Sequence, residues 1–254
     1  MMDAAAAGSL PDVSQNPATP TAASRPAKPR RSVQKKSPKP VIASNGRNAA
    51  VLFVASPRLE RKTFTTALPL AGNREISANL TYQTLLKLAE FSVMLDFDVI
   101  IASDREFNPH LALQHGAAFL LQRGRTFGGK LSGVIETVFA MGYEKIAVVA
   151  NDCPTLSHRD FQKSFNFISE TSIVLGPAKD GGVYLLGLPR ALMELHIDLA
   201  RLQWQAAALF PELVATFTGH NFDVLLLREK PDLDTLSDIA NFINYFDSSD
   251  ETSF

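Results

Sequence analysis

The sequence Lys145-Ile146-Ala147-Val148-Val149-Ala150-Asn151-Asp152-Cys153-Pro154-Thr155-Leu156 decides the fold that we predict. Residues 146–150 are all apolar and include three β-branched side chains, which is typical of a strand buried on both faces. The apolar run ends at Asn151, and Pro154 cannot donate to a sheet ladder. Asp152 is therefore expected just past the carboxyl end of a central strand. Open α/β sheets bind their ligands at that edge.

Other short apolar runs that end in polar or turn residues predict further strands. They lie at residues 49–55, 98–102, 117–122, 173–175, 183–187 and 222–227. Apolar residues at helical spacing predict helices at 75–95, at 131–141 with Gly142 as C-cap, after the N-cap Ser157, at 191–216 with an interruption at Pro211, and at 236–246. Because strands alternate with helices, we predict an α/β fold with a mostly parallel sheet.

Residues 1–47 differ in composition from the rest of the chain. They are rich in Ala, Pro and Ser, and contain eight basic residues but only two acidic ones. Since little in this segment can form a core, we predict a disordered tail. The alternatives are an organellar transit peptide, which the prolines disfavour, a basic arm for an anionic partner, or a linker. Residues 48–246 then form one domain, and residues 247–254 are expected to fray.

Composition excludes several classes of function. The formal net charge of -1 gives no electrostatic basis for binding nucleic acid or a membrane surface. The single cysteine excludes an internal disulfide and favours a reducing compartment, so we expect a cytoplasmic protein. No uninterrupted apolar stretch approaches the roughly 20 residues that span a bilayer. The oligomeric state does not follow from these features.

Three acidic residues are expected at the same edge of the sheet. Asp152 follows the central strand, Asp180 lies between two short strands, and Asp234 opens the last predicted helix. Converging carboxylates repel one another unless a cation lies among them, and Mg²⁺ or Mn²⁺ prefers such oxygen ligands. Because Mg²⁺ completes its coordination shell with water and phosphate oxygens, the pattern predicts a phosphorylated substrate.

Each of these signals also has a purely structural explanation. The Asp-Gly-Gly stretch 180–182 can be a hairpin turn, although its glycines also allow a ligand to approach the backbone closely. Asp234 can be the N-cap of the last helix, with Asp238 favouring the helix dipole, and Asp152 can be a turn residue. Cys153 is not expected to be a nucleophile, because none of the five histidines has a triad-like setting.

Three stretches together resemble a known family: residues 151–156 (NDCPTL), 175–188 (LGPAKDGGVYLLGL) and 232–239 (DLDTLSDI). It is the glycosyltransferase-A-like "transferase 1" family associated with radical-SAM/selenodomain proteins. Some of its members are named arsenosugar biosynthesis glycosyltransferases, and it is related to phospholactate guanylyltransferases. The family pattern is roughly SDCPTL, GPAxDGGYYLLGL and DVDTPEDL, and the similarity extends over about residues 49–246.

The resemblance implies a three-layer α/β/α sandwich with the glycosyltransferase-A, or nucleotide-diphospho-sugar transferase, fold. It also implies a divalent metal, Mg²⁺ or Mn²⁺, held by Asp152 and Asp234. Asp180, with Gly181 and Gly182, is implied to face the donor or acceptor and to act as a base. The implied partners are a nucleotide-sugar or nucleotide and a small-molecule acceptor.

The loop after the first strand departs from the family pattern. Residues 56–64 (SPRLERKTF) keep a proline and a Lys-Thr pair but lack the family's glycine, and Phe64 replaces an arginine. We expect Lys62 and Arg58 to contact the phosphates of the nucleotide. The alternative is that these side chains belong to a solvated basic loop.

A second departure lies before the predicted helix 131–141. Gly129 and Lys130 occupy the positions of a glutamate and an arginine in the family, and Lys130 is the expected nucleotide contact there. Lysine keeps the charge of arginine but loses its planar fork of donors. Trp204 matches a tryptophan common in the family, and a core position explains it equally well.

These features favour a metal-dependent glycosyltransferase-like enzyme that uses a nucleotide-sugar donor and an unknown acceptor. The metal would neutralise the diphosphate as it leaves. One alternative is a nucleotidyltransferase that joins a nucleoside triphosphate to a phosphorylated acceptor and releases pyrophosphate. The other is a degenerate, non-catalytic nucleotide-binding protein, which the altered first loop favours.

Overall fold

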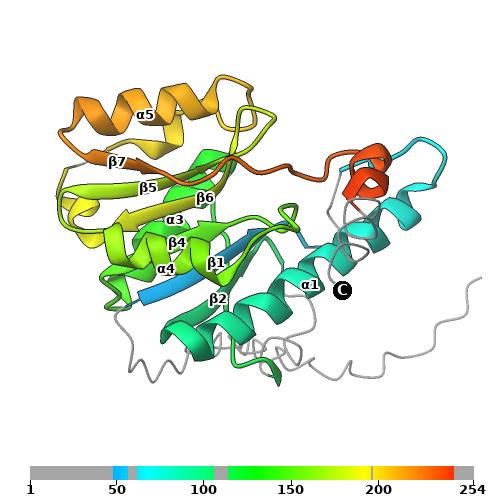
Figure 1. Ribbon diagram of the computed structural model, residues 1–254, viewed down its shortest axis with the longest axis horizontal. Coiled ribbons are helices and arrows are strands. Elements are labelled where there is room, and N and C mark those ends of the chain that lie inside the picture. Colours follow the sequence, from blue (N-terminus) through cyan, green and yellow to red (C-terminus); the bar gives the residue numbers. More distant parts are fainter. Residues whose placement is uncertain (1–47, 57–61, 106–113, 196, 243–254) are drawn as a thin grey trace, which may run out of the picture. The chain divides into compact units, whose positions relative to one another are not determined.

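The structure is a computed structural model that describes residues 48–242 except 57–61, 106–113 and 196. The predictions for residues 1–47, for Arg58 and for the chain beyond residue 242 fall outside the described residues. Within the described part, a seven-stranded sheet carries helices on its faces (Figure 1). None of the helices described there is long and apolar enough to span a membrane.

The strands of the sheet are β1 (Asn48–Val54), β2 (Asp98–Ser103), β3 (Ala118–Leu121), β4 (Lys145–Val149), β5 (Ser172–Pro177), β6 (Val183–Pro189) and β7 (Asp223–Leu226). Their order across the sheet is β3-β2-β1-β4-β6-β5-β7. Of these strands, β6 runs antiparallel to its neighbours β4 and β5, and the other pairs are parallel. The predicted α/β fold with a mostly parallel sheet is therefore confirmed.

Strand β4 lies inside the sheet, as its uninterrupted apolar sequence predicts. It pairs with β1 on one side and with β6 on the other, so that Ala147 is opposite both Ala50 and Gly187. Its residues 146–149 are all buried. Because helices cover both faces of the strand, its side chains need not alternate between apolar and polar.

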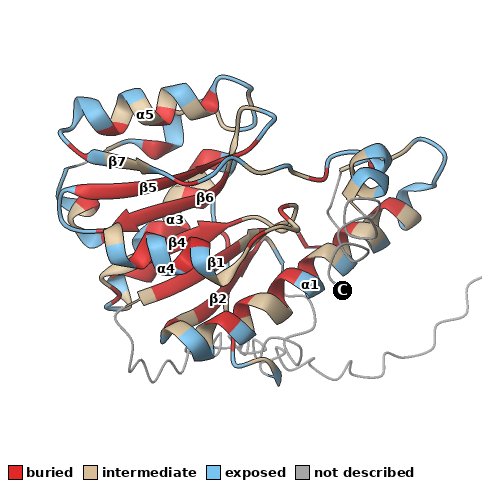
Figure 2. Cartoon of the chain, viewed as in Figure 1, coloured by how far each residue is buried: buried red, intermediate tan, exposed pale blue. Residues whose placement is uncertain are grey.

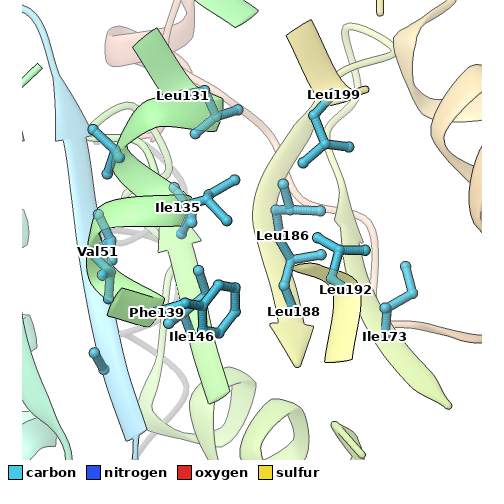
Figure 3. Packing of buried hydrophobic residues seen from close by; sticks show 14 of the residues in the cluster. Val51, Leu131, Ile135, Phe139, Ile146, Ile173, Leu186, Leu188, Leu192 and Leu199 are labelled. Atoms are coloured by element: carbon cyan, nitrogen blue, oxygen red, sulfur yellow. The ribbon is translucent and has the colours of Figure 1, made fainter. Parts of the chain in front are cut away.

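The helices form two layers around the sheet, which gives the predicted three-layer sandwich. One layer contains α1 (Leu70–Leu95) and α4 (His158–Phe167), whose buried apolar residues share one core cluster. The opposite layer contains α3 (Phe127–Ala140), α5 (Leu209–Gly219) and the 3₁₀ turns η1 (Arg190–Glu194) and η2 (Leu199–Arg201). Figure 2 shows that buried residues concentrate in the sheet and the helix faces toward it. Figure 3 shows Ile135 and Phe139 of α3 packed against the sheet near Val51 and Ile146, and all four belong to one core cluster.

The prediction of one helical region at 191–216 with an interruption at Pro211 is wrong. The region contains η1, η2 and most of α5, and turns occupy residues 204–208. Pro211 lies in the first turn of α5, where its missing N–H is not needed for a helical hydrogen bond. The proline therefore marks the beginning of a helix.

Two predicted helices begin earlier than their apolar spacing indicates. Helix α1 begins at Leu70, and α3 begins at Phe127 after the N-cap Thr126. In α3, Gly128 and Gly129 occupy the first turn. Because glycine has low helix propensity, the sequence does not predict a helix at these residues. Ser157 is confirmed as the N-cap of α4, where it forms a capping box with Asp160.

The cluster of aromatic side chains between α1, α4 and Phe97 predicts where a substitution lowers the stability of the fold most. Phe161 is fully buried and stacks on Phe97 with a centroid distance of 5.3 Å. We expect Phe161→Ala to lower the free energy of unfolding by about 3–5 kcal/mol, measured by urea denaturation. Val93→Ala is the control, because Val93 is 87% exposed and should change stability by no more than about 0.5 kcal/mol. Equal losses for both variants would contradict this packing.

Candidate functional site

Three carboxylates meet where β5 and β7 end. Asp180 lies in the turn between β5 and β6, and Asp232 and Asp234 lie in the segment after β7. One carboxylate oxygen from each residue lies within 4.8 Å of the others. The structure thus brings Asp180 and Asp234 together, as the sequence analysis expected of both, and adds Asp232.

Asp232 was not singled out in the sequence, although a signal for it exists. Residues two apart on an extended segment point to the same side, and Asp232 and Asp234 have this spacing. The signal depends on the segment being extended, whereas the sequence predicts a helix that Asp234 opens.

Main-chain hydrogen bonds hold the two segments of the cluster together. The N–H of Lys179 donates to the carbonyl oxygen of Lys230 over 3.1 Å, and the N–H of Lys230 donates to that of Pro177 over 3.1 Å. These bonds continue the parallel pairing of β5 with β7 beyond the strand ends. The carboxylates of the cluster are therefore placed by the sheet itself.

The turn that carries Asp180 depends on its glycines. Gly181 has φ +91°, and a Cβ there would lie 2.2 Å from the carbonyl oxygen of Ala207. The N–H of Gly182 donates to the Asp180 carboxylate over 2.8 Å. Close chain packing and a positive φ thus account for Gly181, and the predicted contact of both glycines with a nucleotide remains a prediction.

Asp152 reaches the cluster through Lys62. The Lys62 Nζ lies 3.0 Å from Asp152 Oδ2 and also forms an ion pair with Asp234. The main-chain N–H of Leu233 donates to the carbonyl oxygen of Asp152 over 2.8 Å. Asp152 and Asp234, the two predicted metal ligands, are therefore neighbours that share one ammonium group. Asp152 does not belong to the three-carboxylate cluster.

Asp234 does not cap the last described helix. The helix begins at residue 236, and Thr235 precedes it. The Asp238 N–H donates to the Thr235 hydroxyl over 3.2 Å, and the Asp238 carboxylate accepts from the Thr235 N–H over 2.7 Å. Thr235 and Asp238 form this cap, so the Asp234 carboxylate is left to interact with Lys62.

Two pKa values reflect the charge at this edge of the sheet. Burial disfavours the charged form of Lys62, but the carboxylates of Asp152 and Asp234 outweigh it and raise the pKa of the ammonium group. Burial, followed by the negative charges of Asp180 and Asp234, raises the pKa of Asp232 to about 7. Lys62 therefore remains a cation, whereas Asp232 takes up a proton near neutral pH.

Of the other residues expected to bind nucleotide, Lys130 pairs with a different acid and Arg58 lies outside the described residues. Lys130 lies 3.9 Å from the Asp104 carboxylate, which accepts a hydrogen bond from the Ser56 N–H at the end of β1. Lys130 thus lies at the same edge of the sheet, near β1 and β2. Arg58 lies outside the described residues, so its predicted phosphate contact remains a prediction.

Trp204 and Cys153 have structural roles. The Trp204 indole N–H donates to the carbonyl oxygen of Leu199, and its ring packs on Phe127 with a centroid distance of 5.6 Å. A Cβ on Gly128 would lie 2.7 Å from the same indole. Cys153 is buried, and burial raises the pKa of its thiol to about 11, so it stays protonated. This agrees with the expectation that it is no nucleophile.

A family model described as "Uncharacterized protein conserved in bacteria (DUF2064)" matches residues 81–204, just under half of the chain. The matched range contains Asp152 and Asp180 and ends before Asp232. No curated protein matches the chain.

Solved structures with the same fold cover most of the chain. A protein of Desulfovibrio desulfuricans G20, provisionally named a nucleotide-diphospho-sugar transferase, matches with a TM-score of 0.66 and 21% identity over 77% of this chain and 86% of that chain. A cytidylyltransferase of Leptospira borgpetersenii matches with a TM-score of 0.54 and 11% identity over 78% and 87% of the two chains. A nucleotidyl transferase of Methanothermobacter thermautotroptrophicus matches with a TM-score of 0.50 and 16% identity over 80% and 98%. The predicted nucleotide-diphospho-sugar transferase fold is confirmed.

Asp232 predicts a pH dependence of stability. Its pKa in the folded state lies above its ordinary value of about 3.9, so between about pH 4 and pH 7 the folded protein binds more protons than the unfolded chain. The free energy of unfolding should therefore fall as the pH rises through this range. We expect Asp232→Asn to reduce this fall, and urea denaturation at about pH 5 and about pH 8 with a chelator present measures it. Asp223→Asn, at an exposed carboxylate, should behave as wild type. An unchanged pH dependence in Asp232→Asn would contradict the assignment.

Proposed function

We propose that the protein is a metal-dependent transferase that uses a nucleotide-sugar donor. The observation that carries the proposal is the cluster of Asp180, Asp232 and Asp234 at the carboxyl edge of the sheet, which the ion pairs of Lys62 with Asp234 and Asp152 connect to a fourth carboxylate. When all four acids are ionised, their charge exceeds that of the single lysine. A divalent cation relieves this excess and at the same time attracts the diphosphate of a donor.

The described carboxylates fit a hard cation such as Mg²⁺ or Mn²⁺. Oxygen ligands on opposite sides of Mg²⁺ lie about 4 Å apart, and the oxygens of Asp180, Asp232 and Asp234 all lie within 4.8 Å of one another. We assign as principal metal ligands Asp234, which belongs to this cluster, and Asp152, which shares the Lys62 ammonium group with it, and we place Asp232 and Asp180 beside the metal. The bound metal would supply charge neutralisation for the departing diphosphate.

Lys62 and Asp180 have separate roles in this proposal. The Lys62 ammonium group lies between Asp152 and Asp234, within reach of a phosphate bound beside them, and adds positive charge where the leaving group becomes negative. Asp180 is exposed at the rim of the cluster, and its carboxylate is held by the N–H of Gly182. That position suits a base that accepts the proton of an incoming hydroxyl group.

A second candidate function is nucleotidyl transfer to a phosphorylated acceptor with release of pyrophosphate. The similarity of the chain to a cytidylyltransferase and a nucleotidyl transferase supports it, and Lys62 beside the carboxylates would stabilise a departing pyrophosphate as well as a diphosphate. The two reactions use the same carboxylates and differ in which bond of the nucleotide breaks. Their products therefore distinguish them.

The product released from a nucleotide panel tests the proposal. With Mn²⁺ present, we expect a nucleotide-sugar to yield a nucleoside diphosphate. Pyrophosphate from a nucleoside triphosphate would establish the second candidate instead. Binding without either product would favour a non-catalytic nucleotide-binding protein. A thermal shift identifies the ligand first, since a ligand at 100 times its Kd stabilises by about 2.7 kcal/mol.

Substitution of Asp234 tests the role of the carboxylates. We expect Asp234→Asn to abolish the Mn²⁺-dependent part of nucleotide binding, because the variant loses a negatively charged ligand, while its free energy of unfolding changes little. Isothermal titration with and without Mn²⁺ measures this difference. Asp223→Asn is the matched control, because Asp223 is an exposed aspartate at the start of β7. Unchanged Mn²⁺-dependent binding in Asp234→Asn would refute the metal assignment.

A further inference from the structure

Helix α1 buries polar side chains along the first half of its inner face. Asn73, Ser77, Thr81 and Thr84 are all buried, at the spacing that places residues on one side of a helix. The second half of the same face is apolar. In Figure 1 the first half of α1 extends past the carboxyl ends of the strands. The polar half therefore lies beside the loops at that edge, where no strand is available for an apolar face to pack against.

The polar half of α1 contacts the loop that carries Asp152. The Asn151 amide donates to the Thr81 hydroxyl over 2.7 Å, and Thr81 in turn donates to the carbonyl oxygen of Ser77 over 2.9 Å. Thr84 donates to the carbonyl oxygen of Asn151 over 3.4 Å. One turn further along the helix, the Lys87 ammonium group donates to the carbonyl oxygen of Pro154. Two residues of the loop are thus bonded to one helix.

Every main-chain carbonyl of residues 151–155 accepts a hydrogen bond. Their donors, in order, are Thr84, the Leu233 N–H, the Leu156 N–H, Lys87 and the Lys230 ammonium group. Two donors come from α1, two from the segment that carries Asp232, and one from the loop's own end. A surface loop ordinarily leaves such groups to water. This loop is fixed from two sides.

The same face of α1 also holds the segment that follows Lys62. The Asn73 side chain accepts from the Thr65 N–H over 3.2 Å and donates to the carbonyl oxygens of Thr65 and Leu68, each over 3.1 Å. Lys62 and Asp152 form an ion pair. Helix α1 therefore bonds both to the segment that follows Lys62 and to the loop that carries Asp152.

We propose that Thr81 and Asn151 are positioning residues, which hold the 151–155 loop against α1 so that Asp152 stands beside Lys62 and Asp234. This inference rests on the proposed function for its consequence, because the carboxylate so placed is the proposed metal ligand. The Thr81 hydroxyl is the centre of the arrangement, since it both accepts from Asn151 and donates to the helix backbone. Its loss removes the shortest of the three hydrogen bonds that join Asn151 to the helix; the other two, each over 3.4 Å, run from the Asn151 amide to the carbonyl oxygen of Ser77 and from the Thr84 hydroxyl to the carbonyl oxygen of Asn151.

Thr81→Val tests the inference because it removes the hydroxyl and keeps the shape of the side chain. Thr81→Ser keeps the hydroxyl. Thr218→Val is the matched control, because the Thr218 hydroxyl also donates four residues back, to Val214 over 2.8 Å, on the exposed face of α5. Hydrogen–deuterium exchange of a peptide over residues 150–156 reports the loop directly, and Mn²⁺ affinity in the presence of nucleoside diphosphate reports the site.

We expect Thr81→Val to raise exchange in the 150–156 peptide by about 3- to 10-fold and to weaken Mn²⁺ binding by a similar factor, as the loss of one hydrogen bond implies. Thr81→Ser and Thr218→Val should stay within about twofold of wild type in both measurements. If Thr81→Val fails to fold, Asn151→Ala removes this bond together with the bond from the Asn151 amide to the carbonyl oxygen of Ser77, so its effect on both measurements should be at least as large.

The inference would be overturned if Thr81→Val showed the same hydrogen–deuterium exchange and the same Mn²⁺ affinity as the control Thr218→Val. A change in exchange without a change in Mn²⁺ affinity would overturn the link between the loop and the metal. Failure of the wild-type protein to bind Mn²⁺ with any nucleotide would overturn the proposed function. The exchange measurement would then still decide whether α1 holds the loop.

Discussion

Repulsion among carboxylates is the constraint on which the carboxyl edge of this sheet depends. Asp152, Asp180, Asp232 and Asp234 lie near one another because strand ends and main-chain hydrogen bonds place them there. Two features relieve the repulsion within the chain. The Lys62 ammonium group lies between Asp152 and Asp234, and Asp232 takes up a proton near neutral pH. A divalent cation would relieve it more completely, which is the physical basis of the proposed metal dependence.

The sheet topology explains why acids so distant in sequence meet. Strand β4 is buried on both faces and ends directly before the loop that carries Asp152. Strand β6 runs antiparallel to β5. The turn that joins them, which carries Asp180, therefore lies at the edge where β5 and β7 end. The segment after β7 then passes over both loops and bonds to each of them. An all-parallel arrangement would have sent the chain away from this edge after β5.

Much of this arrangement could be predicted from local sequence. The uninterrupted apolar run of β4 and the polar residues after it placed Asp152, and the short strands around residues 180–182 placed Asp180. The ion pair of Lys62 with Asp152 could not be predicted, because it joins residues 90 positions apart through tertiary packing. The start of α1 was missed for a related reason. Its first half buries polar residues whose partners lie in distant loops, so its sequence has no apolar stripe.

The location of a bound metal ion tests the central claim most directly. Anomalous diffraction from crystals of the wild-type protein grown with Mn²⁺ and a nucleoside diphosphate would locate it. We predict a manganese peak within coordination distance of the Asp234 and Asp152 carboxylates, with Lys62 moved from between them toward the phosphates. A nucleotide bound at this edge without manganese, or a manganese peak remote from these carboxylates, would contradict the claim.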